Sequence, residues 1–538
     1  MAADPDISLK PASRPARTGN AIAALTGIVV GLATFASATL LSLLFGSENP
    51  LIAVGSAAID FAPPGFKSFI IGLFGTGDKT FIFTLLAVAA LVAACAVGIL
   101  QVRVPPFGTL VLAFVGVVCV AATVSRANSG PLDGVPSALG FIIGWFLLRS
   151  LISRLDHWRV ARDRPSAGTS AVALGSTTSP VAIERRRFLT LAIVAATLSL
   201  LVEAGSGLSA VAQNTAAAVR AKIKLPKPKS PAPAIEPGGD LTIPGISPYI
   251  VPNDDFYRID TALSIPQIDP DSWKLRITGM VENEVELTYA ELLALPLKER
   301  IITLTCVSQE VGGNLIGNAS WLGYPIREVL ARAKPKAGAD MVLSTSIDGF
   351  TASTPLAVLE DTGTDALFAV GMNGEPLPAE HGFPVRMVVP GLYGYVSATK
   401  WVVNLKVTTY AKDQAYWTPR GYSAKAPVKL SSRIDTPQDG YSAKAGVVAV
   451  AGVAWHQHVG IAKVEVMVDG GAWQPAKLAR VVTVDSWLQW SFAWDAAKGD
   501  HTLTVRATDD NGEVQTAREV DVVPNGATGL HSIQVHVD

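Results

Sequence analysis

The chain has 538 residues, which exceeds one ordinary domain and predicts roughly three or four. Hydrophobic residues make up 49% and charged residues only 17%, against ~25% charged in typical soluble domains, which excludes a disordered or wholly soluble chain. The formal net charge of -1 provides no basic field for nucleic acid, and three cysteines exclude a disulfide-stapled scaffold.

The excess of apolar residues lies before residue 213. A bilayer core of ~30 Å requires about 20 apolar residues per helix. We expect a transmembrane region over 1–212, with helices at 21–45, 80–101, 107–124, 135–152 and 188–210. Segment 51–75 is also apolar, but it carries Asp60, Lys67 and two adjacent prolines that interrupt a helix.

Basic residues predict the orientation of these helices. Lys10, Arg14 and Arg17 precede the first run, and eight arginines lie in 149–187, before the last run. The positive-inside rule places both regions in the cytoplasm, so an even number of crossings separates them. The four clean runs supply four, and 51–75 is therefore predicted as a re-entrant or interfacial segment. The last helix then carries everything after residue 213 to the extracytoplasmic side of the cell membrane.

Two shorter segments, one at the start of the last helix and one after it, also carry recognisable patterns. Arg185-Arg186-Arg187-Phe188-Leu189 matches a twin-arginine export signal, and a plain positive-inside flank explains it equally well. Residues 213–239 are rich in proline and lysine, which predicts an extended, semi-rigid linker.

Residues 240–424 predict an α+β domain. Trp273–Gly279 and Arg300–Thr305 have strand character, and short helical stretches interleave with them. Thr288 and Glu291 have the spacing of a capping box, and Tyr324-Pro325 places a proline near a helix start.

Residues 425–538 predict a β-sandwich. Ala462–Asp469 alternates with a period of two and leads into Gly470-Gly471, a hairpin signal. His501–Ala507 alternates likewise, and Asp510-Asn511-Gly512 marks the turn after it.

Cys306 is the one cysteine outside the apolar region. It follows a strand-like run and precedes Gly312-Gly313, so we expect it at a strand end beside a flexible loop. A lone cysteine is usually a small buried hydrophobe. The alternatives are a nucleophile, for which His381 is the only histidine of this domain, and a soft-metal ligand. Zinc is poorly supported, because one cysteine and one histidine fall short of its ligand set.

A second cluster lies between His381 and Trp401, where polar side chains alternate with glycines. Arg386 and Lys400 suit an anionic ligand, and the glycines let backbone N–H groups approach it. Two buried strands with charges at their rim are the plainer interpretation. A third element, Arg258 with Asp260, is equally consistent with a surface ion pair.

Five motifs in order across about 250–424 together resemble the sulfite oxidase family of molybdopterin-dependent oxidoreductases, in its membrane-anchored bacterial type. They are Cys306 in its setting, Gly317-Asn318-Ala319-Ser320-Trp321-Leu322-Gly323, Met372-Asn373-Gly374-Glu375-Pro376-Leu377-Pro378, His381-Gly382-Phe383-Pro384-Val385-Arg386 and Val389-Pro390-Gly391. The last domain resembles that family's immunoglobulin-like dimerisation domain.

The resemblance implies a molybdenum-pterin cofactor (Mo-molybdopterin), with the metal held by the pterin dithiolene and by the thiolate of Cys306. It implies that the pterin is bound by Arg258, Asp260, Asp348, Ser353, His381, Arg386, Ser397 and Lys400. Tyr422 resembles the tyrosine over the substrate side of the metal, which makes Cys306 and Tyr422 the expected catalytic residues. Soft molybdenum suits thiolate sulfur.

Two departures from the family pattern bear on the substrate. Sulfite-oxidising members commonly read Cys-x-x-Asn-x-Arg, whereas this chain reads Cys306-Val307-Ser308-Gln309-Glu310-Val311. The arginine is therefore absent, and the carboxylate of Glu310 next to its position would repel sulfite. The family's histidine near Arg258 is Asp260 here, and one extra residue between Gly394 and Lys400 makes Ser397 a less direct match.

The expected function is oxygen-atom transfer with two-electron exchange. Sulfite dehydrogenation is the alternative, and a membrane-tethered β-sandwich binding protein with a cofactor-free relic domain is the rival class. There is no Cys-x-x-Cys-His, and no histidine precedes His157, so the first four helices offer no imidazole pair for haem. We expect an external electron carrier (a quinone or a cytochrome), a small oxo-acceptor or oxo-donor substrate, and a homodimer through the last domain.

Overall fold

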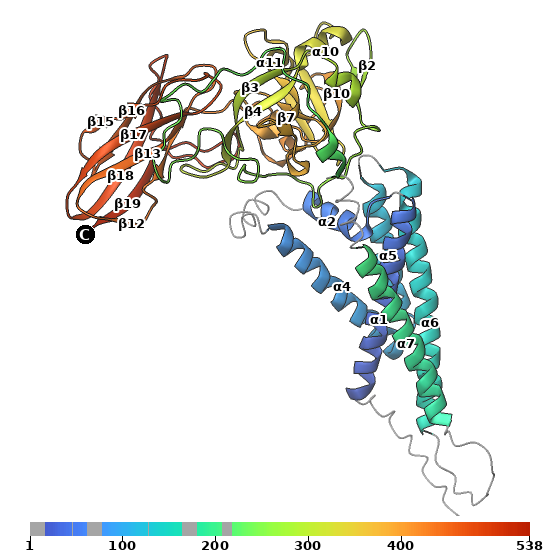
Figure 1. The fold of residues 1–538 in the computed structure, drawn as a ribbon. Helices are drawn as coiled ribbons and strands as arrows, with labels where there is room; N and C mark the ends of the chain where they lie inside the picture. The colour runs from blue at the N-terminus through green and yellow to red at the C-terminus, as the bar shows by residue number, and fades with distance from the viewer. Residues whose placement is uncertain (1–16, 46, 62–77, 127–128, 164–179, 207–217) are drawn as a thin grey trace, which may run out of the picture. The chain divides into compact units, whose positions relative to one another are not determined.

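The computed structural model describes residues 17–45, 47–61, 78–126, 129–163, 180–206 and 218–538. The chain forms two compact units, one up to Val211 and one from Ala212 onward. The first is helical and the second contains the sheets, as Figure 1 shows by colour and label.

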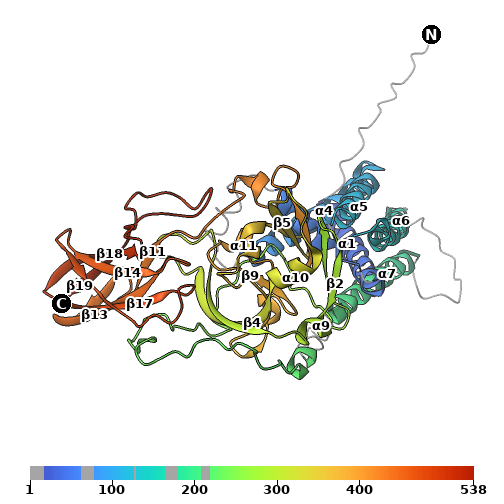
Figure 2. The same ribbon diagram turned by 90° about the horizontal axis from the view of Figure 1, so that it is seen from above.

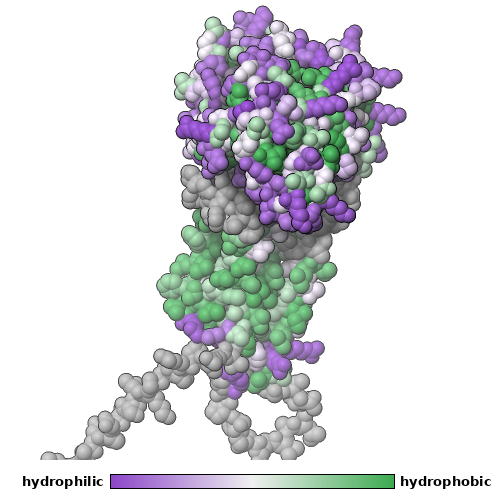
Figure 3. Space-filling view, turned by 90° about the vertical axis from the view of Figure 1, so that its left-hand side faces the viewer, coloured by the Kyte–Doolittle hydropathy of each residue, from purple (hydrophilic) through white to green (hydrophobic). Residues whose placement is uncertain are grey.

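The first unit contains five long helices at the predicted runs: α1 (Arg17–Phe45), α4 (Asp78–Arg103), α5 (Phe107–Val124), α6 (Val135–Asp163) and α7 (Pro180–Ser206). By length and composition, four helical stretches could cross a membrane: Asn20–Phe45, Thr80–Arg103, Phe107–Val124 and Pro131–Arg162. Hydrophobic side chains cover the visible face of these helices, and hydrophilic ones gather at one end (Figure 3). The fifth crossing predicted at 188–210 is helical up to Ser206, but α7 is not among those four.

Close packing of α1 against α4 depends on glycine. A Cβ on Gly27 would lie 2.0 Å from the carbonyl oxygen of Ala94, and one on Gly98 would lie 1.9 Å from that of Ala23. No larger residue fits either position, because the two backbones approach within the space of a side chain. Small residues at helix contacts are typical of membrane-spanning bundles.

The segment predicted as re-entrant or interfacial begins with α2 (Pro50–Phe61). Its 12 residues rise about 18 Å, which is shorter than the hydrocarbon core. Asp60 forms an ion pair with Arg126, at 2.9 Å. Residues 62–75 of the prediction lie outside the described residues.

Two sheets build the domain after the linker, as the α+β prediction requires. The first has the order β2 (Val285–Thr288), β1 (Lys274–Gly279), β10 (Val402–Thr408), β5 (Met341–Ser346) and β6 (Thr351–Pro355). The second has the order β3 (Lys298–Thr305), β4 (Ile316–Pro325), β7 (Leu367–Met372) and β8 (Glu375–Pro376), with β9 (Arg386–Val388) paired to β7.

The local helix signals of this domain are confirmed. Thr288 Oγ1 accepts from Glu291 N, and Thr288 N donates to Glu291 Oε2, so the capping box opens α9 (Tyr289–Leu293). Pro325 precedes α10 (Ile326–Ala333), whose buried face is apolar. A third short helix, α11 (Leu356–Glu360), follows β6.

The last domain is the predicted sandwich, and Figure 2 shows its two sheets in side view. One sheet has the order β11 (Ser431–Thr436), β13 (Gly446–Trp455), β17 (Leu488–Ala496) and β16 (Lys477–Leu478). The other has the order β12 (Tyr441–Ala443), β19 (His531–Val537), β18 (Gly499–Asp509), β14 (Ile461–Val468) and β15 (Trp473–Pro475). Asp469 and Gly470 have φ of 52° and 69° and join β14 to β15, which confirms the hairpin.

The sandwich has a hydrophobic core of its own, and a few of its residues also pack into the core of the α+β domain. Val453, Trp455 and Trp487 of the sandwich belong to the same buried cluster as Trp321 and Trp401 of the α+β domain. The sandwich is therefore a packed part of the second unit, and its position against the α+β domain is fixed by burial.

Part of the predicted linker is paired with the α+β domain. Ser230 bridges Lys298 in parallel, Lys229 N donates to Leu297 O, and Glu299 N donates to Ser230 O. The proline-rich backbone is extended here, as the sequence predicted. It pairs with the edge strand β3 at Ser230.

Candidate functional site

Cys306 lies directly after the last residue of β3, Thr305. Its backbone N donates to Leu315 O at 2.9 Å, and its carbonyl accepts from Gln309 N at 3.1 Å. Ser308 N approaches the thiol sulfur at 3.4 Å. The side chain is half-buried, and burial raises the pKa of the thiol. The strand-end position predicted for Cys306 is thus observed.

The loop after Cys306 is tightened by Gln309. Its Nε2 donates to Gly313 O at 2.6 Å and its Oε1 accepts from Leu315 N, so one buried amide closes the loop from within. Gly312 has a φ of 78°, which a residue with a side chain rarely adopts. The glycines predicted as flexible are therefore part of an ordered turn.

Two of the predicted donors, Arg258 and Lys400, meet at Asp260. Arg258 Nε contacts its carboxylate at 2.9 Å and Lys400 Nζ contacts it at 2.7 Å, and the Asp260 side chain is only 4% exposed. Lys400 also donates to Glu380 O. Burial lowers the pKa of Lys400 to about 8, and Asp260 opposes that shift. Residues 140 positions apart are thus brought together, and the interpretation of Arg258 and Asp260 as a mere surface pair is wrong.

Arg386 is buried, and it donates to the main-chain carbonyls of Met387 and His381. Its guanidinium lies 5.0 Å from the ring centroid of Trp321. Burial lowers its pKa to about 10. Within the described ranges, no ion pair joins Arg386 to a carboxylate.

His381 is a neutral group in this environment. Burial and the nearby Arg386 lower its pKa to about 4. Its Nε2 lies 3.0 Å from Asn253 O, so the neutral ring donates there, and its edge packs on Phe256. His381 therefore adds an uncharged polar face among three cations, all of which influence its pKa.

Three other predicted contacts make hydrogen bonds inside the protein. The buried Ser397 hydroxyl donates to Leu392 O and Tyr393 O. Ser353 Oγ donates to Ala424 O at 3.1 Å, and Asp348 Oδ1 accepts from Phe350 N in the β5–β6 turn. These contacts organise the segments around the donors; binding of the pterin by these three residues stays a prediction.

Tyr422 lies in an aromatic cluster. Its ring centroid is 5.1 Å from that of Trp417 and 5.5 Å from that of Tyr395. Ser423, the next residue, donates its backbone N to Pro524 O of the sandwich. The position of Tyr422 is therefore fixed by both domains.

Comparison with known proteins gives two family matches. Residues 262–417 match the oxidoreductase molybdopterin binding domain, and residues 431–505 match a bacterial Ig domain. The central domain belongs to the sulfite oxidase family of molybdopterin oxidoreductases.

Two sulfite oxidases are among the relatives to which the chain is similar. The chain is 29% identical to mitochondrial sulfite oxidase of Homo sapiens over 316 residues, which is 50% of this chain and 57% of that protein. It is 29% identical to sulfite oxidase of Arabidopsis thaliana over 274 residues, which is 42% of this chain and 69% of that protein. The sulfane dehydrogenase SoxCD of Paracoccus pantotrophus is similar at 23% identity, with a TM-score of 0.47, over 54% of this chain and 83% of that one. The chain spans little more than half of the human relative.

The donor set fits the family's Mo-molybdopterin cofactor. Arg386 and Lys400 are buried and Arg258 is partly exposed, and Lys400 and Arg258 both pair with Asp260, so cationic donors suited to a phosphate gather at one place. The buried hydroxyl of Thr305, beside Cys306, has no hydrogen-bond partner. Within the described ranges, no group of three or more His, Cys, Asp or Glu side chains could hold a metal.

Sequence reasoning missed Tyr257 and Asn373. Burial strongly raises the pKa of the Tyr257 hydroxyl, and Cys306 and Arg386 both influence that pKa. Asn373 has a φ of 51° and bridges Val251 O, Asn253 Oδ1 and Ser320 N. The motif around Asn373 was visible in the sequence, but its bridging role was not.

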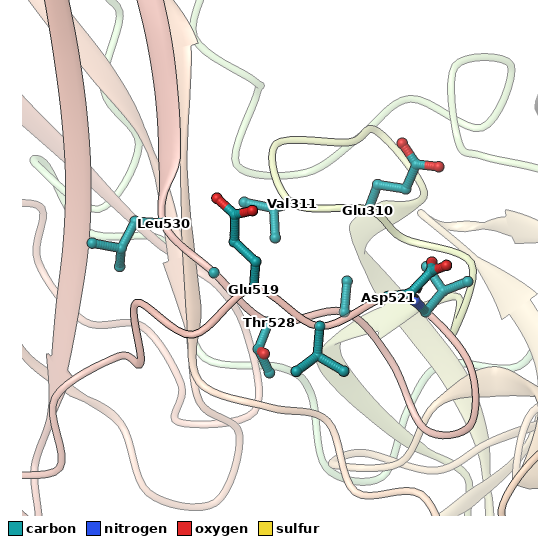
Figure 4. Close-up of a pocket in the computed structure, with 10 residues that line it drawn as sticks. Glu310, Val311, Glu519, Asp521, Thr528 and Leu530 are labelled. Atoms are coloured by element: carbon teal, nitrogen blue, oxygen red, sulfur yellow. Dashed lines mark hydrogen bonds between the residues drawn. The ribbon is translucent and has the colours of Figure 1, made fainter.

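A cavity of about 400 Å³ lies beside the Cys306 loop. Figure 4 shows Glu310 and Val311 on that loop facing the segment from Glu519 to Leu530 of the sandwich. Its charged lining residues, Glu310, Glu519 and Asp521, are all acidic. Sequence reasoning identified Glu310 but not the two carboxylates that lie opposite.

Replacing Arg386 by methionine tests the fit of the donors. Methionine keeps much of the apolar contact with Trp321 and removes the charge that a phosphate requires. We expect the molybdenum and pterin content of purified protein to fall by roughly tenfold or more, measured by elemental analysis and pterin fluorescence. Arg276→Met, at an exposed arginine paired with Glu286 in β1, is the matched control and should leave both contents unchanged. Equal cofactor content in the two variants would contradict the assignment.

Proposed function

We propose that this protein is a membrane-anchored molybdenum-pterin oxidoreductase that transfers an oxygen atom and exchanges two electrons with an external carrier. The observation that carries the proposal is the half-buried thiol of Cys306 in the same domain as a cluster of Arg386, Lys400 and Arg258 around Asp260. When bound, the cofactor supplies the two-electron redox chemistry, and water balances the oxygen atom.

Each residue has a distinct role in this proposal. Cys306 supplies the protein ligand to the metal, and Arg258, Arg386 and Lys400 bind the pterin phosphate. Asp260 orients Arg258 and Lys400 through its two ion pairs. The neutral His381 contacts the uncharged pterin, supported by Asp348, Ser353 and Ser397, and Tyr422 lies over the substrate side.

The charge around the site bears on the substrate. Val311 occupies the register where sulfite-oxidising members commonly have an arginine, Glu310 is its neighbour, and the adjoining cavity adds Glu519 and Asp521. Like charges disfavour binding of a sulfite dianion. We therefore propose an oxo-compound without negative charge, such as a sulfoxide. Sulfite dehydrogenation is the second candidate, because the curated relatives are sulfite oxidases.

The membrane part of the proposal rests on the apolar helices and the distribution of arginine. Four described helical stretches could cross a bilayer, and the basic flanks put both ends of the four-helix region in the cytoplasm. The catalytic domain then lies on the extracytoplasmic side, where a quinone or a cytochrome accepts or donates electrons. The Ig-like domain is proposed to mediate a homodimer.

The rival class, a tethered binding protein with a relic domain, has less support. A relic has no need of a half-buried thiol, nor of a buried arginine near a lysine that pairs with a buried carboxylate. Molybdenum near one atom per chain in purified protein separates the two classes.

Cys306→Ser tests the ligand assignment. We expect loss of turnover by at least about a thousandfold, since a hydroxyl is a poor ligand for soft molybdenum, while the thermal unfolding curve stays similar. The matched control is Cys95→Ser in α4, which should retain full activity. Full turnover in Cys306→Ser would refute the assignment.

Glu310→Gln tests the role of charge in substrate choice. Removing one exposed negative charge should lower the KM for sulfite by roughly twofold to fivefold and leave the KM for a neutral sulfoxide unchanged. Steady-state kinetics with both substrates measures this, and Glu375→Gln, an exposed position in β8, is the control. An unchanged KM for sulfite would show that this carboxylate does not influence substrate choice.

Reporter fusions test the orientation. A phosphatase fused after residue 220 should be active, and one fused after residue 170 should be inactive, because the enzyme works only outside the cytoplasm. The reverse pattern would overturn the predicted crossings.

A further inference from the structure

The Ig-like domain holds the strand that carries Cys306. Thr303, three residues before the thiol, makes three hydrogen bonds to that domain. Its N donates to Asp485 O at 3.0 Å, its carbonyl accepts from Gln457 Nε2 at 2.9 Å, and its hydroxyl accepts from Trp487 N at 2.8 Å. These bonds are buried, so water does not compete for them.

The same Gln457 side chain also binds the segment that follows Arg386. Its Oε1 accepts from Gly391 N at 3.1 Å, five residues after Arg386. His458, the next residue, has Nε2 3.2 Å from Pro390 O, and its ring occupies the space that a side chain on Gly391 would need. One amide, 5% exposed, therefore connects the Cys306 strand to the segment that follows the Arg386 strand.

A second contact holds the loop after the thiol. Arg433 of β11 donates from Nη1 to Gly313 O at 2.6 Å. Its Nε pairs with Asp435 at 2.6 Å, and these side chains are only 8% and 6% exposed. The ring of His531 packs against Gly312, where a Cβ would come within 2.2 Å. The carbonyl of Gly313 thus receives one bond from Gln309 within the loop and one from the Ig-like domain.

We propose that the Ig-like domain positions Cys306 within its own chain, with Gln457 and Arg433 as the positioning residues. The inference rests on the proposed function in one respect, namely that Cys306 is the metal ligand. Both flanks of the thiol are held from the same domain, three residues before it and seven after it. The loop between Cys306 and Leu315 contains two glycines, so its order depends on such contacts.

The test uses full-length protein with Gln457→Leu and Arg433→Ala substitutions. On each preparation, molybdenum per chain is measured first, and the rate of iodoacetamide alkylation at Cys306 is then followed by peptide mass spectrometry. We expect alkylation to be about tenfold faster in both variants and molybdenum content to fall, because a hydrogen bond that orders the loop is lost. Arg433→Lys, which retains a donor, should restore part of the protection.

The matched control is Arg506→Ala, which removes an arginine paired with Glu465 inside the Ig-like domain and away from the Cys306 loop. A merely structural role would lower the unfolding temperature of Gln457→Leu, Arg433→Ala and Arg506→Ala alike, and it would leave the alkylation rate of the folded protein unchanged. Alkylation at the wild-type rate in both Gln457→Leu and Arg433→Ala would overturn the inference. Absence of molybdenum from the wild type would instead count against the proposed function, and the alkylation rates would still decide the positioning role.

Discussion

The burial of Arg386 and Lys400, with Asp260 as the carboxylate that Lys400 pairs with, is the constraint on which the candidate site of the second unit depends. Burying a cation costs free energy unless an anion compensates it, and Asp260 compensates only part of the charge of Arg258, Lys400 and Arg386. A bound anionic cofactor supplies what is missing, so the site and its cofactor are stabilised together. The two sheets of the α+β domain bring the three cations together from positions far apart in the sequence.

Local patterns predicted the elements well, and they did so for physical reasons. The capping box at Thr288, the helix after Pro325 and the hairpin at Asp469 depend on neighbouring residues, so the sequence contains their whole explanation. The ordered motifs pointed to the proposed cofactor-binding residues, and that role stays a proposal. Tyr257 and the pairing of Asp260 with Lys400 were not, because these contacts join strands and loops that the chain topology alone brings together.

The Ig-like domain shows most clearly that contacts between distant segments are not predictable from local sequence patterns. Its strands and turns were predictable, but Gln457 and Arg433 carry no local signal of a role, since each acts through a backbone carbonyl of the other domain. The shared core around Trp455 and Trp487 explains why those bonds hold, because burial fixes the two domains against each other. A module that reads as an appendage in the sequence is therefore part of the framework of the site. The carboxylates that line the adjoining cavity also come from both domains.

The central claim is that the sulfur of Cys306 binds molybdenum, and X-ray absorption at the molybdenum edge tests it most directly. The account predicts three sulfur neighbours in the wild-type protein, two from the pterin dithiolene and one from Cys306, and two in Cys306→Ser. An identical sulfur shell in both proteins would contradict it.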